Sequence, residues 1–225
     1  MALQIFSEAQ RKWWTLAAVS FGLFMIMLDN TVVNVALPSI QQDLGADLSQ
    51  LQWIVTGYAL SFAALMLIGG KLADAYGRRR LFVLGIVVFT GASLWCGLAG
   101  SGEMLIAARV LQGVGAALMN PATLSIIAAT FPPKERGTAI GIWAGVSALA
   151  LAIGPLAGGL LTEHLSWHWI FFINIPVGVV AIAASYLLIV ESKDETHESL
   201  DVPGLATSAL GLFALTYGLI EANQY

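Results

Sequence analysis

Seven long hydrophobic segments, separated by short polar stretches, dominate the 225 residues of this chain. A helix needs roughly 20 apolar residues to cross the hydrocarbon core of a bilayer, and each segment comes close to that length. The pattern therefore predicts an all-α polytopic membrane protein. The predicted spans cover residues 14–37, 51–70, 81–100, 104–130, 138–161, 169–190 and 202–220.

Proline positions mark several of the predicted ends. We expect Pro38 to close the first span, and Pro132 with Pro133 to close the fourth, because proline cannot continue a helix. Pro203 suits the first turn of the seventh span. A hydrophilic, mostly acidic stretch follows the sixth span and indicates a boundary. The predicted parts are a six-helix bundle, a cytoplasmic loop and one extra transmembrane helix, over residues 1–190, 191–201 and 202–225.

Basic residues are distributed unevenly between the predicted loops. Nine of the ten Lys and Arg residues precede the first span or lie in the alternate loops 71–80, 131–137 and 191–201. The loops without any basic residue are 39–50, 101–103 and 162–168. Since positively charged loops stay in the cytoplasm, we expect a multi-pass protein of the cell (inner) membrane with a cytoplasmic N-terminus.

Composition argues against several other classes of protein. The chain is 58% hydrophobic and only 11% charged, with a mean hydropathy of +0.80, whereas a soluble domain carries about 25% charged residues. Nothing resembles a basic nucleic-acid-binding face. Enzyme motifs are absent, so we expect no enzyme activity, no catalytic residue and no metal site. The single Cys96 is expected to pack in an apolar run, and His164, His168 and His197 form no metal motif.

An internal repeat relates the two halves of the predicted bundle. Residues 69–74 align with residues 158–163 at an offset of 89, and the basic residues 78–80 are replaced by residues 167–169, which carry two Trp. The predicted topology puts the first copy inside and the second outside. Paired three-helix units of opposite topology are typical of secondary transporters. The repeat therefore favours an inverted 3+3 arrangement.

Two ionisable residues lie inside predicted spans, Asp29 in the first and Arg109 in the fourth. An ionisable side chain near the bilayer centre costs at least about 3 kcal/mol, so each is a functional candidate. At helical rise, Asp29 lies about 12 Å and Arg109 about 8 Å from the same face of the membrane. We therefore expect the two groups to share one cavity, where Asp29 could bind and release protons. The alternative is a permanent structural ion pair.

Polar and aromatic side chains in the spans suggest the lining of a cavity. In the fourth span, residues at spacings of three and four place amides and small residues on the face of Arg109. Amides in the first span are four residues apart, and aromatic rings can stack on cations. Hydrogen bonds between helices are the alternative role for each amide. The candidates are Asn30, Asn34, Trp53, Tyr58, Gln112 and Asn120.

Two further stretches are candidates for conformational change. The fifth span contains Gly and Pro at spacings that allow close helix packing, so it could act as a gate, although plain packing explains most of it. The inner loop 70–80 could be a positive-inside anchor, or its acidic residue could form a detachable latch. The residues concerned are Gly154, Pro155, Gly158 and Gly159 in the span, and Gly70, Asp74, Gly77, Arg78 and Arg79 in the loop.

Over its whole length the chain resembles the major facilitator superfamily, specifically its fourteen-helix drug:H+ antiporter branch. Four stretches, in order and in the appropriate helices, are similar to motifs of that branch. One position in the loop departs, because Ala75 stands where a basic residue is usual. The four stretches are residues 28–38 (LDNTVVNVALP), 70–80 (GKLADAYGRRR), 109–115 (RVLQGVG) and 154–159 (GPLAGG).

The resemblance implies proton-driven export from the cytoplasm by alternating access. It implies that Asp29 is a proton or cation site, that Arg109 is a coupling residue, and that no cofactor is needed beyond the proton gradient as energy source. It also implies that the chain is the N-terminal half of a transporter, completed by a C-terminal half in the same or a separate chain. The other expected partners are the lipid bilayer, protons and a cationic or amphipathic small molecule, with no nucleic acid.

Two alternatives remain open. One is a metabolite transporter of the same superfamily, working as an importer or an exporter. The other is a truncated, non-transporting membrane protein that packs against a partner chain. The odd number of spans and the missing second bundle favour the latter for the chain as given.

Overall fold

The computed structural model describes residues 8–194 and 201–221, and every regular element in them is a helix. Six helical stretches are long and apolar enough to cross a membrane, with α6 and α7 counted as one stretch. The all-α polytopic fold predicted from the hydrophobic pattern is therefore confirmed. The helices are α1 (Glu8–Leu44), α2 (Leu48–Tyr76), α3 (Arg78–Gly97), α4 (Gly102–Thr130), α5 (Pro133–His164), α6 (Trp169–Phe172), α7 (Asn174–Leu188) and α8 (Val202–Glu221).

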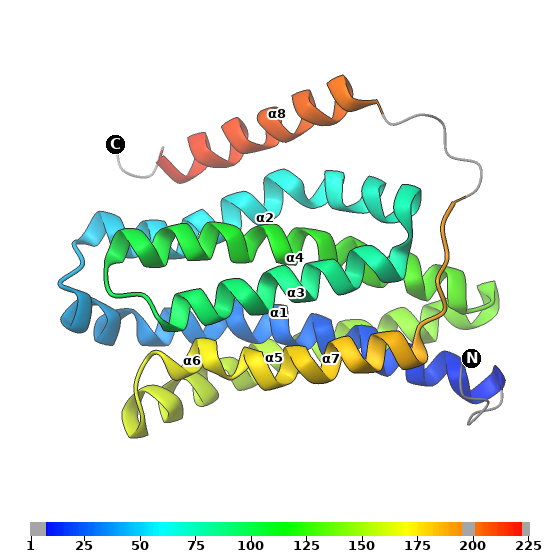
Figure 1. Cartoon of the computed structure of the whole chain (residues 1–225), viewed down its shortest axis with the longest axis horizontal. Helices are drawn as coiled ribbons and strands as arrows, with labels where there is room; N and C mark the ends of the chain where they lie inside the picture. Colours follow the sequence, from blue (N-terminus) through cyan, green and yellow to red (C-terminus); the bar gives the residue numbers. More distant parts are fainter. Residues whose placement is uncertain (1–7, 195–200, 222–225) are drawn as a thin grey trace.

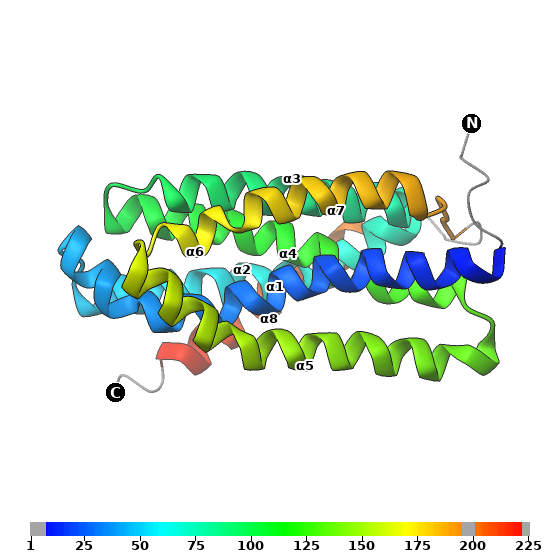
Figure 2. The same ribbon diagram turned by 90° about the horizontal axis from the view of Figure 1, so that it is seen from below.

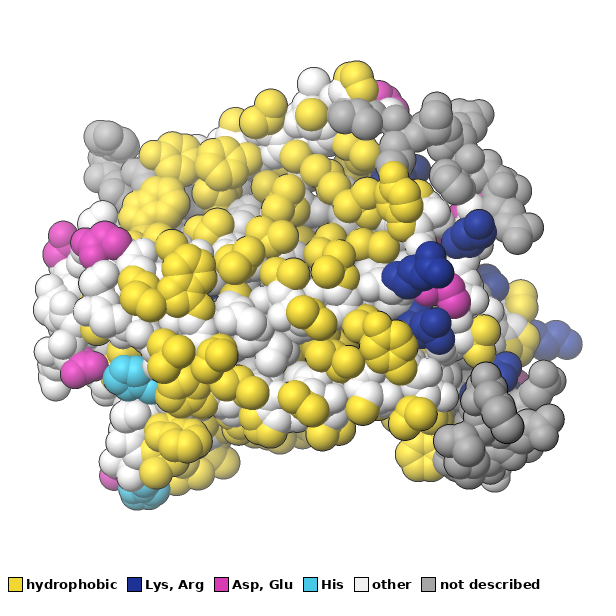
Figure 3. All heavy atoms as spheres, viewed as in Figure 1, with side chains coloured by type: hydrophobic (Ala, Val, Ile, Leu, Met, Phe, Trp, Pro, Cys, Tyr) yellow, Lys and Arg dark blue, Asp and Glu magenta, His cyan; other side chains and the backbone are white. Residues whose placement is uncertain are grey.

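The long helices run side by side as an elongated bundle (Figure 1). Their connections alternate between its two ends, and the basic residues gather at one of them, which we call the basic end (Figure 3). Hydrophobic side chains cover the middle of the face that Figure 3 shows, as a lipid-facing belt would require. Contacts between α1 and later helices tie the basic end together, through a Lys12–Glu135 ion pair and a bond from the Thr15 hydroxyl to the Leu188 carbonyl.

Helix α1 continues further than the sequence predicted. It passes through Pro38 and ends at Leu44, so the prediction that Pro38 closes the first span is wrong. Proline in a helix loses one backbone hydrogen bond. Here the loss falls near the end of the helix, where Pro38 is exposed, and membrane helices tolerate such breaks when the freed carbonyl finds another partner.

The predicted loops between the first three spans are mostly helical. Loop 39–50 shrinks to three residues, Gly45 to Asp47, because Gly45 takes a φ of +61° and Asp47 caps α2. The Asp47 carboxylate accepts from the Gln50 backbone at 2.8 Å, and the Gln50 side chain accepts from the Asp47 backbone at 3.1 Å. Loop 71–80 is a single break at Gly77, whose φ of +115° strongly favours glycine.

The remaining predicted ends agree better, with two differences. Helix α4 ends at Thr130, just before the predicted proline stop, and α5 begins at Pro133 itself. The sixth span divides into α6 and α7 at Ile173, where the backbone angles stay helical with φ of −58° and ψ of −28°. The seventh forms α8, which lies along α2 (Figure 1), but its apolar part Pro203–Leu219 is shorter than the six others. That α8 crosses the membrane, and that a domain boundary precedes it, therefore stay predictions.

The packing of α2 and α5 follows the repeat found in the sequence. Helix α2 packs on α4, and α5 packs on α1 (Figure 2), so the second helix of each three-helix unit contacts the first helix of the other. The repeat glycines lie at these contacts. A Cβ on Gly69 would collide with the Ala117 carbonyl of α4, and one on Gly158 would lie 3.0 Å from the Val32 carbonyl of α1.

We predict a graded loss of stability when these glycines are changed to alanine. Gly69→Ala forces backbone apart and should cost about 1–3 kcal/mol, whereas Gly158→Ala needs a smaller shift and should cost less. Gly159→Ala is the control, since no atom lies within 4 Å of its Cβ, and it should leave stability unchanged or slightly higher. Thermal unfolding of the purified variants in detergent measures the series. Equal effects at Gly69 and Gly159 would contradict the close-packing account.

Candidate functional site

A cluster of polar side chains lies between two hydrophobic clusters in the middle of the bundle. On α1 the first cluster reaches Ile26 and the second begins at Leu28, with Asp29 next to the boundary. On α3 the first cluster reaches Phe89 and the second begins at Cys96. The polar cluster therefore occupies the junction of the two clusters, at one depth in several helices. Its members are Asp29, Ser93, Arg109, Gln112 and Asn174.

Asp29 is fully enclosed and is held by three hydrogen-bond donors. Its Oδ2 accepts from Arg109 Nη1 at 2.6 Å, and its Oδ1 accepts from Gln112 Nε2 at 2.8 Å and Asn174 Nδ2 at 3.2 Å. The side-chain exposure of Asp29 is 0% and that of Arg109 is 1%. A buried carboxylate needs such partners, because an unpaired buried charge is very costly.

Arg109 crosses from α4 to α1 and α2. Its Nε donates to the Ile54 carbonyl at 3.1 Å, and its Nη1 also donates to Gln112 Oε1 at 2.6 Å. The guanidinium carbon lies 4.2 Å from the centroid of the Tyr58 ring and 5.9 Å from that of Phe171. This fork of donors with a ring on its face needs arginine, since a lysine ammonium offers only a point charge.

Sequence reasoning missed Ser93 and Asn174. Both are buried, and both reach the same carboxylate network from α3 and α7. The only signal in the sequence is that each is a polar residue inside a predicted span, where a hydrogen-bond partner is required. Nothing in local spacing shows that the two converge on Asp29.

The other candidates for a substrate cavity are spread over the bundle. Tyr58 and Gln112 join the cluster, but Asn30 and Asn34 are exposed on α1, and the Asn34 amide donates to the Asn30 carbonyl at 3.0 Å. Trp53 on α2 faces α8, where its ring centroid lies 6.0 Å from that of Tyr217. The candidate Asn120 is half-buried on α4, and its carbonyl accepts from the Thr123 hydroxyl.

The five residues predicted to form a gating loop surround the junction of α2 and α3. Arg78 Nε donates to Asp74 Oδ1 at 2.9 Å, so the predicted acid pairs across the Gly77 break. Gly70 lies against α4, with its Cβ position 3.4 Å from Pro121. Arg79 donates from Nη1 to the Ile189 carbonyl at 3.1 Å.

A further residue of this junction, Glu191, was not predicted. Its carboxylate accepts from the backbone N–H of Arg79 at 3.0 Å and of Arg80 at 3.2 Å, while the Ser192 carbonyl accepts from the N–H of Arg78 at 2.9 Å. The segment that follows α7 therefore satisfies the free N–H groups at the start of α3. A Cβ on Gly77 would lie 2.8 Å from Glu191 Oε1, so a side chain there would displace the carboxylate that caps α3.

The glycine motif of α5 divides between packing and exposure. Gly154 and Gly158 are buried against α1, whereas Pro155 is exposed and nothing lies within 4 Å of a Cβ on Gly159. Pro155 lies inside a continuous helix.

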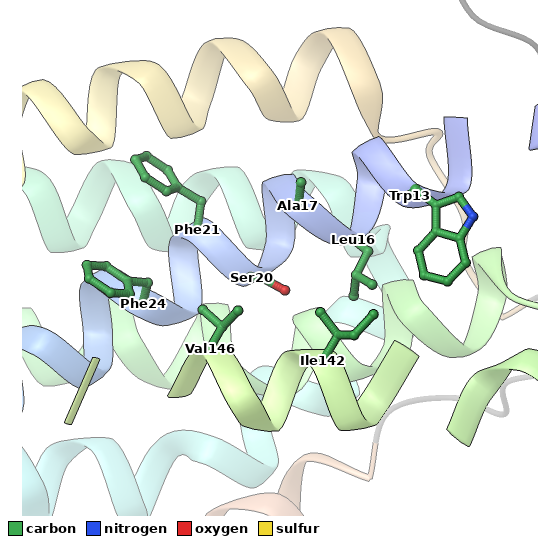
Figure 4. Close-up of a pocket in the computed structure, with 8 residues that line it drawn as sticks. All are labelled: Trp13, Leu16, Ala17, Ser20, Phe21, Phe24, Ile142 and Val146. Atoms are coloured by element: carbon green, nitrogen blue, oxygen red, sulfur yellow. The ribbon is translucent and has the colours of Figure 1, made fainter. Parts of the chain in front are cut away.

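An apolar cavity of about 490 Å³ lies between α1 and α5 (Figure 4), and no residue of the charged cluster lines it. One polar side chain lines it, Ser20, whose hydroxyl is buried and has no hydrogen-bond partner among the described residues. A cavity of this polarity suits the hydrophobic part of an amphipathic molecule. Its lining residues are Trp13, Leu16, Ala17, Ser20, Phe21, Phe24, Ile142 and Val146.

We predict that the Asp29–Arg109 pair is strongly non-additive in stability. Asp29→Leu or Arg109→Met alone leaves the other charge buried and should cost about 3–5 kcal/mol. The double variant removes both charges and should be more stable than either single variant. Unfolding in detergent measures all three, and a double variant that loses the sum of the two single losses would contradict a direct pair.

We predict that Glu191→Ala loosens the start of α3. Two backbone N–H groups lose their acceptor, so amide hydrogen exchange at Arg79 and Arg80 should accelerate about tenfold. Mass spectrometry of peptides over this turn measures the change. The control is Glu163→Ala, which removes an exposed acid at the other end of the bundle. Unchanged exchange at Arg79 and Arg80 in Glu191→Ala would show that the Glu191 carboxylate does not cap α3.

Known proteins resemble the chain in sequence and in fold. It is 43% identical over 216 residues to a tetracenomycin C resistance and export protein of Streptomyces glaucescens, covering 96% of this chain and 40% of that protein. It is 45% identical over 215 residues to the puromycin resistance protein pur8 of Streptomyces alboniger, covering 95% of this chain and 43% of that protein. The chain thus spans about two fifths of the length of these curated relatives.

Solved structures agree on the fold. The crystal structure of a peptide transporter, POT, in complex with sulfate matches with a TM-score of 0.73, covering 96% of this chain and 49% of that one. The sequence identity is 16%, so this match concerns the fold alone. The family model of the Major Facilitator Superfamily matches residues 19–220. This match and these relatives show that the chain is a multi-pass membrane protein belonging to the Major Facilitator Superfamily, a family of transporters rather than enzymes.

Proposed function

We propose that this chain is the N-terminal half of a proton-coupled exporter of drugs or amphipathic small molecules, working by alternating access. The observation that carries the proposal is the buried Asp29–Arg109 pair. Among the described residues, these two are the fully buried charged side chains. Ionisable groups at such depth are rare and are usually tied to transport.

The geometry gives Asp29 two possible partners for its charge. In this conformation Arg109 Nη1 neutralises the carboxylate at 2.6 Å, and neither side chain reaches solvent. A proton can replace the guanidinium as the neutralising group only after the bundle opens. Protonation and opening are then linked, which is what coupling of a proton to alternating access requires.

The direction of transport follows from charge distribution and from the relatives. The basic end carries nine of the ten Lys and Arg residues, and we place it in the cytoplasm. Protons then enter Asp29 from the opposite side, driven by the membrane proton gradient, and no other cofactor is needed. Resistance and export names among the relatives support outward movement of toxic small molecules.

The second half of the pathway is proposed to come from a C-terminal bundle. The relatives extend well beyond the matched part, and much of α5 is exposed in the described bundle. An exposed apolar helix in a transporter needs lipid or another helix against it. Isolating the native protein and measuring its mass would show whether that bundle lies in the same chain or in a separate one.

Asp29→Asn should abolish coupling, because the amide keeps the shape of the carboxylate and cannot carry a proton on and off. The variant also leaves the Arg109 charge unpaired, so its folding and insertion are checked before coupling is compared. The measurement is substrate-induced proton movement in vesicles containing the complete transporter. Asp43→Asn is the matched control on the same helix, since its side chain can still accept from Trp167 Nε1, now at 2.9 Å.

Wild-type coupling in Asp29→Asn would overturn the proton role. Substrate uptake into cells rather than efflux would favour the importer alternative. A chain that is stable alone and produces no flux with any candidate C-terminal half would favour the non-transporting alternative.

A further inference from the structure

Asn174 occupies a special position in the sixth span. It is the first residue of α7, directly after Ile173, and its exposed fraction is 2%. Its Nδ2 donates to Asp29 Oδ1 at 3.2 Å and to Ser93 Oγ at 3.3 Å. It is therefore the contact between the sixth span and the carboxylate.

With its hydroxyl in the observed orientation, Ser93 favours one orientation of the two neighbouring amides. Its hydroxyl donates to the Phe89 carbonyl at 2.8 Å, so its oxygen can only accept from other groups. It accepts from Gln112 Nε2 at 2.8 Å and from Asn174 Nδ2. Both amides consequently present nitrogen to the carboxylate, which suits an ionised Asp29.

The two amides differ in their freedom to turn. Gln112 is held at both ends, because its Oε1 accepts from Arg109 Nη1 at 2.6 Å and from the Cys96 thiol at 3.6 Å. The hydrogen bonds of the Asn174 side chain to other described residues all use Nδ2. Rotation of the Asn174 amide about Cβ–Cγ therefore breaks the two hydrogen bonds of Nδ2. It breaks no hydrogen bond between the amide oxygen and another described residue.

We propose that Asn174 is a positioning residue that senses the protonation of Asp29 through rotation of its amide. With Asp29 ionised, Nδ2 donates to the carboxylate as observed. When Oδ1 takes a proton, the new O–H needs an acceptor, and a half-turn of the amide supplies one in Asn174 Oδ1. The Ser93 hydroxyl then turns from the Phe89 carbonyl and donates to the same amide oxygen. This inference rests on the proton role of Asp29 proposed above.

The position of Asn174 explains why such a sensor matters. Helix α7 runs from Asn174 to the basic end, where the carbonyl of its last residue, Leu188, contacts α1 and that of the following Ile189 contacts α3. A changed hydrogen bond at the start of α7 therefore acts on a helix that contacts both neighbours at its other end.

The test is infrared difference spectroscopy of the complete transporter in liposomes, between high and low pH. A protonated-carboxyl C=O band that disappears in Asp29→Asn belongs to Asp29. In Asn174→Leu this band should move to higher frequency, because the O–H has lost its acceptor. Coupled efflux should fall about tenfold, the factor expected for a lost hydrogen bond to a charged group.

Two further variants separate sensing from plain structure. Asn174→Thr carries a hydroxyl that can donate or accept, so it should restore much of the efflux and of the band position. Ser185→Ala, on the same helix, removes only a bond to the Ala181 carbonyl and should change neither. If Asn174→Leu fails to fold, the band in Asn174→Thr decides: a band at the wild-type position together with restored coupling supports the sensor.

The outcomes distinguish this inference from the proposed function. An unchanged carboxyl band in Asn174→Leu, with coupling still lost in Asp29→Asn, overturns the sensor and leaves the proton role standing. Full coupling in Asp29→Asn, or no band that depends on Asp29, overturns both.

Discussion

A carboxylate and a guanidinium in the middle of an apolar bundle constrain the arrangement of all the helices around them. Removing either charge from water costs several kcal/mol, and the loss is offset only when every donor and acceptor finds a partner. Helices α1, α2, α3 and α7 and, with two side chains, α4 supply the groups of this network. Because the bonds are directional, they fix the relative depth of these five helices. The hydrophobic clusters on either side, which lack such direction, can fill space around that fixed plane.

Close approach of helices is the second constraint, and it depends on the repeat. Gly69 and Gly158 let α2 and α5 contact the backbones of α4 and α1. Between helices surrounded by lipid there is little hydrophobic driving force, so van der Waals contact at small residues does more of the work. Both contacts involve a helix that carries a charged residue of the network. The inverted repeat thereby places Asp29 and Arg109 opposite each other from the first helices of the two units.

The sequence predicted the helices well and the convergence of polar groups poorly. Long apolar runs indicate spans directly, and the buried Asp29 and Arg109 stand out because charge is so costly there. Helix ends were predicted too short, because polar residues such as Asp47 and Gln50 cap and extend a helix beyond its apolar part. Pro38 and Gly77 show the same error, since Pro38 lies inside a helix that was expected to end there and Gly77 is the one non-helical residue of an expected loop. Ser93, Asn174 and Glu191 carry no local pattern, and only the packing of distant segments brings them to their partners.

The network at Asp29 and the junction at Glu191 are connected through α7 and the segment that follows it. Asn174 begins this helix at the carboxylate, and Glu191 follows its end at the start of α3. At both places the segment supplies a polar side chain to another helix rather than apolar packing alone. Such bonds are either made or broken, whereas apolar contacts change gradually as helices slide. A helix fixed by directional bonds at both ends has few intermediate positions, so it suits a bundle that must alternate between two states.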